Sequence, residues 1–448
     1  MPASELHPDY RAAKPRYKLI RAIINNDAQC YLRTPDDSDA YRSLQYKEDA
    51  ILTNFTKLTC EGLTGLVFRK KLRVSLPDAL DYLLDNVTGG GINLYQFAQY
   101  ITTEVLKTGR MGLLIDFHNN GKRAFLKPYV AETIINWKTA EINGIVQPYL
   151  ITLKEEILKD NGDKFSQETE IQYRVLSLEN GVYFQEIYNE SDVLIDIIDV
   201  RDEDGNTFNY IPFVCIGSEN NDLAVDNQPL YDLSVLNLGH YRNSADYEES
   251  IYICGQPYPV TNVGEASQEE FMSANPNGVA FGSRKGLVLA AGGSFQLAQA
   301  NPNQLVAQAM REKLEQAAKV GARLIEEAGS GRETAEGARI RYGTAHGALY
   351  TLTSNISWGV EAALRVICRF MGVSDSTVSF MLNDQFYEDS VDANVLAQMW
   401  MGLDRTTVSK EEIREYMIKG GIPLNQTTDL LALEDQYDPM EGIDDVVA

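Results

Sequence analysis

The sequence predicts an α+β fold, in which a body of helices and antiparallel strands carries two long helices separated by a small β-containing module. Three observations predict this fold. Strand-like apolar runs separated by turn dipeptides fill residues 133–213. Apolar residues recur at helical spacing in 228–255 and 303–327, and a stretch rich in Gly, Pro, Ser and Asn, 256–302, lies between them. A third and longer helical pattern, 337–371, follows after a polar break.

The composition is that of a large acidic protein with a substantial core. The chain has 448 residues, of which 44% are hydrophobic, and its formal net charge is −24. That charge repels nucleic acid and anionic lipid at long range, so it excludes a conventional nucleic-acid reader but not a protein that lets DNA pass without holding it. The five cysteines are isolated and mostly lie in apolar runs, which is typical of reduced, buried thiols. No signal peptide or membrane-spanning run is evident, so we expect a soluble intracellular protein.

The first 130 residues are predicted to be mainly helical and to end in a β-hairpin. Helical spacing marks 17–27, 48–70, 75–87 and 92–109, and the last of these ends at a glycine. The segment 110–130 then has two apolar runs joined at Asn-Asn-Gly, which predicts two strands and a tight turn.

Residues 133–213 are predicted to form an antiparallel meander attached to these helices. Apolar and β-branched segments follow one another closely in this stretch. The breaks between them fall at good turn dipeptides, which are Asn143-Gly144, Asn161-Gly162, Asn180-Gly181 and Asp204-Gly205. Consecutive strands joined by short turns pair with their neighbours, so a meander is the simplest arrangement.

Two long helices and the module between them come next. The helix over 228–255 has a proline in its first turn. The helix over 303–327 has one apolar face, made by Val306, Met310, Leu314, Ala317, Gly321 and Leu324. Small residues allow close approach of another helix, in the same subunit or in a neighbour; they are Ala307, Ala309, Ala317, Ala318, Gly321 and Ala322. The module 256–302 contains three strand candidates, at 258–263, 278–282 and 286–290.

The break between the second and third long helices is longer and more polar than a helical hairpin requires. Gly329 and Gly331 give its backbone conformational freedom, and the residues after them are polar and nearly neutral in sum. After the third helix we expect a strand near 377–387 and two short helices between 392 and 423. The acidic end of the chain, from Glu434, is expected to be mobile.

The sequence contains none of the catalytic or metal-binding patterns that we sought. Walker A, HExxH, GxSxG and GxGxxG patterns are missing, and no cysteine–histidine cluster occurs. The glycines of TGGGINL, 88–94, predict a turn before a helix rather than a phosphate loop, because no Lys-Ser/Thr follows. Asp116 and His118 share one face of a strand, but a surface position explains them better than a catalytic pair does. We therefore expect no enzymatic activity, cofactor or metal; a perturbed carboxylate pair in a pocket would instead indicate an enzyme.

The order of these elements resembles that of the portal proteins of tailed bacteriophages, whose subunits form a ring through which DNA enters and leaves the capsid. The segment PLYDLSVLNLGHYRNSADYEES is similar to the first stem helix of such subunits. GRMGLLIDF and VSFMLNDQF are similar to recurring strands of a portal subfamily known only as a domain of unknown function, and LPDALDYLLDN and YVAETIINWK resemble it too. The resemblance covers roughly residues 10–420, and the order of the motifs is more specific than any one of them.

The resemblance implies a portal-like subunit with an α/β wing, two long stem helices, a small β-containing clip, a long wing helix and a short helical crown. The implied parts are the wing over 1–227, the stem helices over 228–255 and 303–327, the clip over 256–302, the tunnel loop over 328–336, the long wing helix with a return strand over 337–392, and the short crown with an acidic tail over 393–448.

The resemblance also implies a function. Portal subunits form a homo-oligomeric ring, usually of twelve, at a capsid vertex of the virion, and the ring is assembled in the host cytoplasm. It would be the conduit for DNA packaging and ejection and the docking site for the terminase large subunit and a head–tail adaptor protein, next to the major capsid protein. Double-stranded DNA would pass through non-specifically, and no membrane is implied. The alternative is another virion assembly protein, such as a capsid or baseplate component, without a DNA channel.

Two sets of site residues follow from the resemblance. The tunnel loop is expected to line the channel, at Ala328, Gly329, Ser330, Gly331, Arg332, Glu333, Thr334, Ala335 and Glu336. In the clip, Arg284 and Lys285 are candidates for an exposed docking patch, although a basic pair is more often only solvated surface.

Overall fold

The protein divides into two units, Met1–Asn383 and Asp384–Ala448. The computed structural model describes residues 2–34, 39–118, 123–142, 144–159, 165, 167–255, 258–264, 268–274, 276, 289, 291–299, 304–321, 335–384, 386, 396, 398–401 and 409–419. Within these ranges no helix combines the length and the apolar character needed to span a bilayer.

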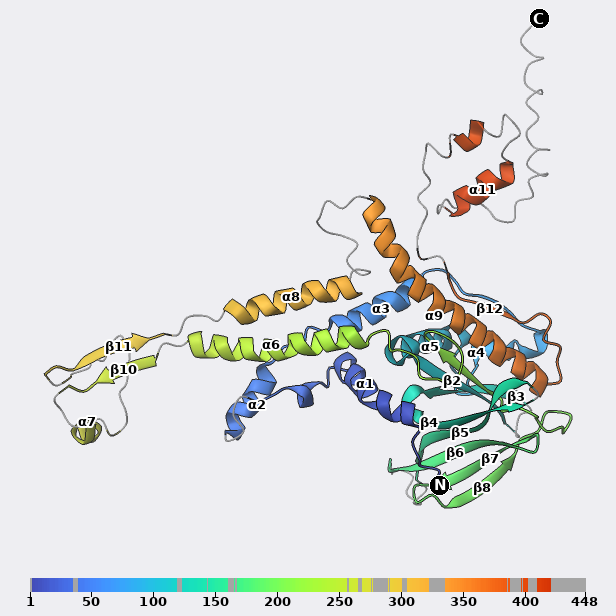
Figure 1. The fold of residues 1–448 in the computed structure, drawn as a ribbon, viewed down its shortest axis with the longest axis horizontal. Helices are drawn as coiled ribbons and strands as arrows, with labels where there is room; N and C mark the ends of the chain where they lie inside the picture. The colour runs from blue at the N-terminus through green and yellow to red at the C-terminus, as the bar shows by residue number, and fades with distance from the viewer. Residues whose placement is uncertain are drawn as a thin grey trace, which may run out of the picture. The chain divides into compact units, whose positions relative to one another are not determined.

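Three helices and a short 3₁₀ turn build the N-terminal part of the first unit (Figure 1): α1 (Pro8–Ile24), η1 (Gln29–Tyr31), α2 (Ala40–Asp49) and α3 (Phe55–Val67). α1 begins nine residues before the predicted start at 17, because His7 caps it and Pro8 suits the first helical position. Asn54 caps α3 by accepting a hydrogen bond from the Lys57 amide at 2.9 Å.

The prediction of one helix over 48–70 is wrong in one respect, because the chain is not helical between the end of α2 and the start of α3. The amide of Ile51 donates to Ser244 Oγ at 2.8 Å, and the carbonyl of Thr53 accepts from Asn237 Nδ2 at 2.9 Å. These backbone groups are bonded to a helix almost 200 residues away, so they cannot complete a local helical turn.

The predicted helix over 75–87 is also shorter in the structure. Ser75 belongs to strand β1 (Arg73–Ser75), and only a 3₁₀ turn, η2 (Asp78–Leu80), and the single turn of α4 (Tyr82–Asp85) follow. Helix α5 (Leu94–Thr108) agrees with the prediction and ends at Gly109, whose φ of 78° lies in the left-handed region. A Cβ at Gly109 would lie 2.6 Å from the carbonyl oxygen of Asn227, so this position requires glycine.

The predicted hairpin over 110–130 is confirmed and forms part of a three-stranded antiparallel sheet with strand order β3-β2-β9. Its strands are β2 (Arg110–His118), β3 (Arg123–Val130) and β9 (Phe213–Gly217). A 3₁₀ turn, η3 (Ala131–Thr133), leads from it into the next sheet.

The predicted antiparallel meander is confirmed for five strands, which lie in the sheet in their sequence order, but the last strand expected in it, near residue 213, is β9 and belongs to the three-stranded sheet. They are β4 (Ile134–Ile142), β5 (Ile145–Leu158), β6 (Thr169–Glu179), β7 (Val182–Asn189) and β8 (Leu194–Asp199). Asn180 and Gly181 both have positive φ, at 52° and 77°, as a tight hairpin turn with right-handed twist requires.

The two long helices extend from this body as an arm (Figure 1), which consists of α6 (Tyr231–Gly255) and α8 (Gln304–Val320). Between them lie strand β10 (Tyr258–Asn262), helix α7 (Gln268–Ala274) and strand β11 (Ser294–Ala298). β10 and β11 pair antiparallel, which confirms the strand predicted at 258–263. The strand candidate at 278–282 and most of that at 286–290 lie outside the described residues, as do residues 322–327 of the second predicted helix.

The longest helix is α9 (Ala335–Phe370), and it lies across the body of the first unit (Figure 1). It packs against the three-stranded sheet: a Cβ at Gly359 would lie 2.5 Å from Ile216 of β9. After α9, strand β12 (Ser379–Met381) pairs with β1 in a two-stranded sheet. In the second unit, α11 (Lys410–Lys419) begins with a capping box, in which Ser409 N–H donates to Glu412 Oε2 at 2.8 Å and the Glu412 amide donates to Ser409 Oγ at 3.1 Å.

Candidate functional site

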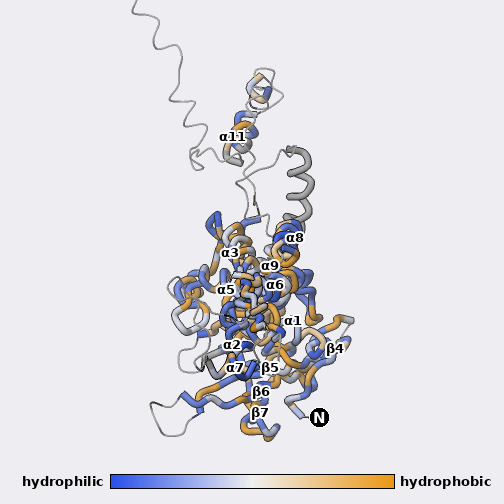
Figure 2. Tube along the Cα trace, turned by 90° about the vertical axis from the view of Figure 1, so that its left-hand side faces the viewer, coloured by the Kyte–Doolittle hydropathy of each residue, from blue (hydrophilic) through white to orange (hydrophobic). Residues whose placement is uncertain are grey.

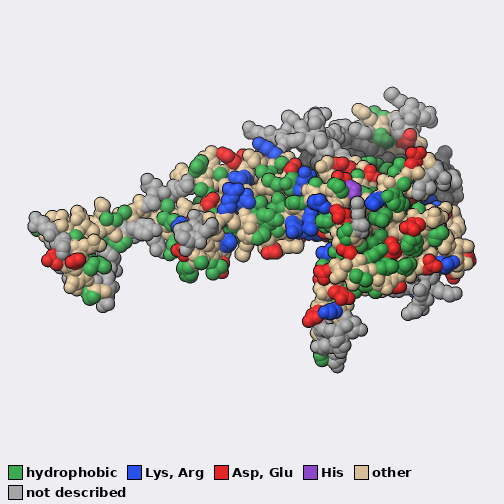
Figure 3. All heavy atoms as spheres, turned by 60° about the horizontal axis from the view of Figure 1, so that its bottom comes forward, with side chains coloured by type: hydrophobic (Ala, Val, Ile, Leu, Met, Phe, Trp, Pro, Cys, Tyr) green, Lys and Arg blue, Asp and Glu red, His purple; other side chains and the backbone are tan. Residues whose placement is uncertain are grey.

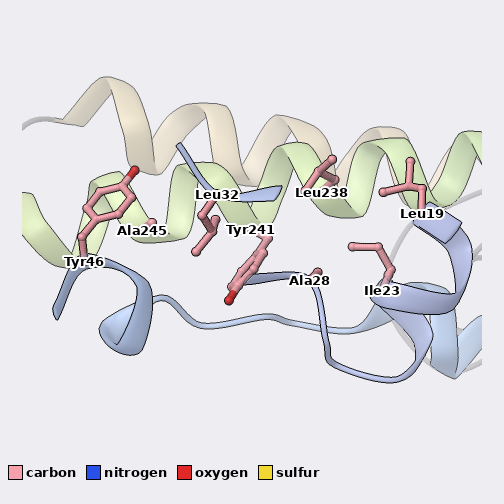
Figure 4. Packing of buried hydrophobic residues seen from close by; sticks show 8 residues of the cluster. All are labelled: Leu19, Ile23, Ala28, Leu32, Tyr46, Leu238, Tyr241 and Ala245. Atoms are coloured by element: carbon pink, nitrogen blue, oxygen red, sulfur yellow. The ribbon is translucent and has the colours of Figure 1, made fainter. Parts of the chain in front are cut away.

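The arm is the candidate functional part of the chain, and α6 is its central element. One side of α6 contributes Leu238, Tyr241 and Ala245 to an apolar cluster (Figure 4). The N-terminal segments supply the rest of this cluster, namely Leu19, Ile23, Ala28, Leu32 and Tyr46. Figure 4 shows that α8 and the N-terminal helices lie on opposite sides of α6. Because α6 is covered on two sides, it is fixed to the body along much of its length.

Buried polar contacts set the register between α6 and the N-terminal helices. Asn237 Oδ1 accepts hydrogen bonds from the amide and the hydroxyl of Thr56, at 3.1 and 3.0 Å, while its Nδ2 donates to the carbonyl of Thr53. Both Asn237 and Thr56 are fully buried. A buried amide group that satisfies three partners disfavours any shifted packing, since a shift would leave those partners unpaired.

Nearer the far end of α6, two further contacts continue this attachment to α2. Tyr46 donates its phenolic hydrogen to Asp246 Oδ1 at 2.6 Å, and burial together with this carboxylate raises the pKa of Tyr46. Arg42 lies 2.6 Å from Glu249 in a more exposed ion pair.

The contact between α6 and α8 depends on a small residue on α6. A Cβ at Gly239 would lie 3.0 Å from Lys313 Cε, so glycine lets the lysine stem of α8 lie directly on the α6 backbone. Asn243, with its amide oriented to satisfy both ends, donates to the Gly239 carbonyl at 3.2 Å and accepts from Lys313 Nζ at 3.1 Å. Burial, and then the Lys313 charge, lower the pKa of His240, so the imidazole is neutral at pH 7.

The small residues predicted to allow close helix packing on α8 divide into two groups. Ala317 is buried, with 1% of its surface exposed, whereas Ala307, Ala309, Ala318 and Gly321 are half-buried. Ala322 lies outside the described residues. Packing within the subunit therefore accounts for Ala317, and the half-buried positions leave surface on α8 for other contacts.

A pocket of about 490 Å³ opens where the arm meets the body. Its lining includes Leu63, Leu106, Leu233 and Leu352, which come from α3, α5, α6 and α9. Among its described lining residues Glu219 is the one charged side chain, so the carboxylate pair that would indicate an enzyme is not found there. Across the described part of the chain, no group of three or more His, Cys, Asp or Glu side chains could hold a metal ion.

The glycine turn before α5 has the role that the sequence predicts. Asn93 caps α5 by accepting a hydrogen bond from the Gln96 amide at 2.8 Å. The Gly90 and Gly91 amides donate to Thr88 Oγ1 and Asn86 Oδ1, at 3.3 and 2.8 Å. These amides have partners within the turn, unlike the free amides with which a phosphate loop binds its ligand.

The predicted tunnel loop and clip residues fall mainly outside the described residues. Residues 328–334, Arg284 and Lys285 are among those not described. Ala335 and Glu336, which we assigned to the loop, form instead the first two positions of α9. That correction agrees with helix propensity, because Ala and Glu are both strong helix formers.

The sequence reasoning missed two features of the arm and its surroundings. One is the buried Asn237–Thr56 contact, which no local pattern signals because its partners are 181 positions apart. The other is the basic outer face of α1, formed by Arg11, Lys14 and Lys18, whose spacing of three and four residues in an acidic chain was a usable signal.

Comparisons with known proteins bear on the arm and on the whole chain. A family model described as a domain of unknown function (DUF4055) matches residues 229–371, which run from the start of α6 to the end of α9. None of the curated proteins compared with the chain matches it significantly.

Solved structures similar to this chain come from gene transfer agent (GTA) particles and from a phage portal protein. A chain from the neck of an empty GTA particle has 14% identity and a TM-score of 0.44, covering 92% of this chain and 94% of that chain. A chain from the virion of a native GTA particle has 14% identity and a TM-score of 0.42, covering 85% and 94%. An HK97-family phage portal protein from Corynebacterium diphtheriae has 10% identity and a TM-score of 0.35, covering 75% and 96%. The solved structures that this chain is similar to thus include a member of the portal family, the family that its sequence resembles.

Proposed function

We propose that this chain is the subunit of a portal ring, a virion connector that conducts DNA into and out of a capsid. The observation that carries the proposal is the arm: α6 and α8 pack along each other, a β-hairpin lies between them in the chain, and α9 follows them on the body. Both the order of these elements and the sequence motifs of α6 resemble those of portal subunits.

The geometry favours a channel on the α8 side of the arm. α8 covers the side of α6 opposite the N-terminal helices (Figure 4), and it is the element that precedes residues 328–334 in the chain. In the ring, residues 328–334 would extend into the channel from there. The net charge of −24 keeps the DNA from adhering, and Arg332 provides a weak phosphate contact that Glu333 beside it moderates.

The module between α6 and α8 is proposed to contact neighbouring subunits and the docking partners. Its paired strands expose apolar side chains on a small, thin element, at Val260, Phe295 and Leu297. Exposed apolar side chains of this kind are typical of surfaces that are covered in an assembly. The terminase large subunit during packaging and a head–tail adaptor afterwards are the proposed partners of this end, and the major capsid protein is the proposed neighbour of the wing.

Electron microscopy of the purified protein tests this proposal directly. Class averages should show closed rings, with about twelve subunits as in assembled portals, and an axial hole wide enough for double-stranded DNA. Light scattering at moderate salt should give a mass many times the 50.1 kDa of one chain. A monomer at high protein concentration, with no rings, would refute the proposal, and a closed sheet or disc without a hole would favour a capsid or baseplate component.

A further inference from the structure

α1 presents a basic face to solvent in a chain that is strongly acidic. Arg11, Lys14 and Lys18 lie three and four residues apart, so their side chains share one face of the helix. Tyr10, Tyr17 and Ile20 of the same helix are buried on an adjoining face. In Figure 3, basic side chains gather where α1 joins the arm, among surfaces that elsewhere carry many acidic groups.

The charges of this basic face are barely compensated within the subunit. Arg11 pairs with Glu5 at 3.4 Å, but both side chains are exposed, and such pairs contribute little. Lys14 lies over the ring of Tyr10 at 5.9 Å, and neither Lys14 nor Lys18 forms an ion pair with any described residue. The face is therefore available to an anionic partner.

A second face of the same unit has the opposite charge and a similar spacing of its charged groups. Asp78, Asp81 and Asp85 are exposed, and none of them forms an ion pair with a described residue. In the 3₁₀ turn of η2, positions three apart are eclipsed, and in α4 positions four apart share a face, so the three carboxylates point the same way. They span about 12 Å along the chain direction, against about 10 Å for the three cations of α1.

The two faces lie on different elements of the first unit, α1 and η2–α4. α4, which contains Asp85, packs against α5. Figure 2 shows α3 and α5 to the left of α1, which packs against both of them. Subunits of a ring meet through two different surfaces, so a basic face and an acidic face on different elements of one unit can meet between neighbouring copies.

We propose that α1 of one subunit docks, through Arg11, Lys14 and Lys18, on the Asp78–Asp81–Asp85 face of the next subunit. This inference rests on the proposed ring. Identical subunits of net charge −24 repel one another, and a contact between opposite charges offsets that repulsion and sets the direction in which neighbours join.

Charge reversal of each face, and of both together, tests the contact. R11E/K14E/K18E and D78K/D81K/D85K should each raise the protein concentration at half-assembly about tenfold or more, because attraction becomes repulsion. The variant with all six changes should assemble close to the wild type, because its faces are complementary again. K57E/K138E/K159E, which reverses three lysines elsewhere in the unit, of which Lys138 and Lys159 are exposed and Lys57 is half-buried, is the control and should assemble normally.

Thermal unfolding and circular dichroism of each variant confirm that it folds, and analytical ultracentrifugation measures assembly. If either single-face variant assembles like the wild type, or the six-fold variant stays as defective as the others, the docking contact is refuted. Loss of binding to duplex DNA by R11E/K14E/K18E with assembly unchanged also refutes it and assigns the basic face to nucleic acid. If the wild type itself forms no rings, it is the proposed function that fails.

Discussion

The buried carboxylate of Glu155 on β5 should be one of the strongest single stabilising groups in the body. It accepts hydrogen bonds from Lys127 Nζ at 2.7 Å and from Arg174 Nε at 2.9 Å, and it also accepts from Gln172 and from the Tyr129 hydroxyl. Burial alone would raise its pKa, but Arg174 and Lys127 outweigh burial and lower the pKa to about 2.

The size of the effect follows from that pKa. A carboxyl group whose ordinary value is 4.5 and whose pKa in the folded protein is about 2 contributes about 3 kcal/mol at neutral pH. Glu155→Gln removes the charge and leaves Arg174 buried without its counter-ion, so a loss of about 3 kcal/mol is expected. Because folding lowers the pKa of this carboxyl group, its contribution to the free energy of unfolding is complete above pH 4.5 and is lost as the pH falls from there toward 2.

Urea unfolding at fixed protein concentration, at pH 7 and at several values between 5 and 2, measures this loss. The matched control is Glu156→Gln, because Glu156 is the next residue on the same strand but is exposed, and a loss below about 0.5 kcal/mol is expected there. A loss below about 1 kcal/mol for Glu155→Gln at pH 7 would refute the reasoning. The reasoning would also be refuted if the free energy of unfolding of the wild type fell no faster than that of Glu155→Gln between pH 5 and pH 2.

Three other changes have defined outcomes. Deleting 329–334 should leave ring assembly intact but impair DNA packaging or retention; normal packaging and retention would remove the role of this segment, and loss of the ring would show it to be structural. Deleting 260–298 should abolish ring assembly, motor binding or both, and a variant that retains both would disprove the role proposed for this module. Gly109→Ala should lower the free energy of unfolding by about 2 kcal/mol, because alanine at that φ is strained and its Cβ meets a carbonyl oxygen. Gly65→Ala on α3 is the control: its Cβ meets nothing within 4 Å, so the change should be neutral or stabilising. Equal unfolding free energies for the two glycine variants would contradict this account.

The parts of the fold that were predictable are those that local signals determine. The meander and the hairpin follow from alternating apolar residues and Asn-Gly turns, and α5 follows from its cap and its terminal glycine. The break between α2 and α3 was not predictable, since Ile51 and Thr53 bond to α6, which is distant in the sequence. Strand β11 was not predicted either, because its partner β10 lies more than thirty residues earlier in the sequence and no local pattern signals such a pairing.

The candidate site was predictable to a smaller extent. The helix–module–helix order could be found because helical periodicity over long segments is a strong signal. The start of α9 was misplaced by two residues, within the usual fraying of helix ends. The charges of α1 and of Asp78–Asp85 are visible in the sequence as two separate spacings, but their exposure on the folded unit requires the structure.

The attachment of α6 from Asn237 as far as Glu249 gives the arm the properties of a stiff lever. A helix of 25 residues is about 37 Å long, and its root is clamped by Asn237 and by the apolar cluster around Tyr241. A tilt of about 5° at such a root moves the free end by about 3 Å, roughly the size of one water molecule. Strain applied to the β10–β11 tip is therefore conveyed to α1–α3 at the root, so a mechanical load at one end of the arm can be sensed in the body without any change of secondary structure.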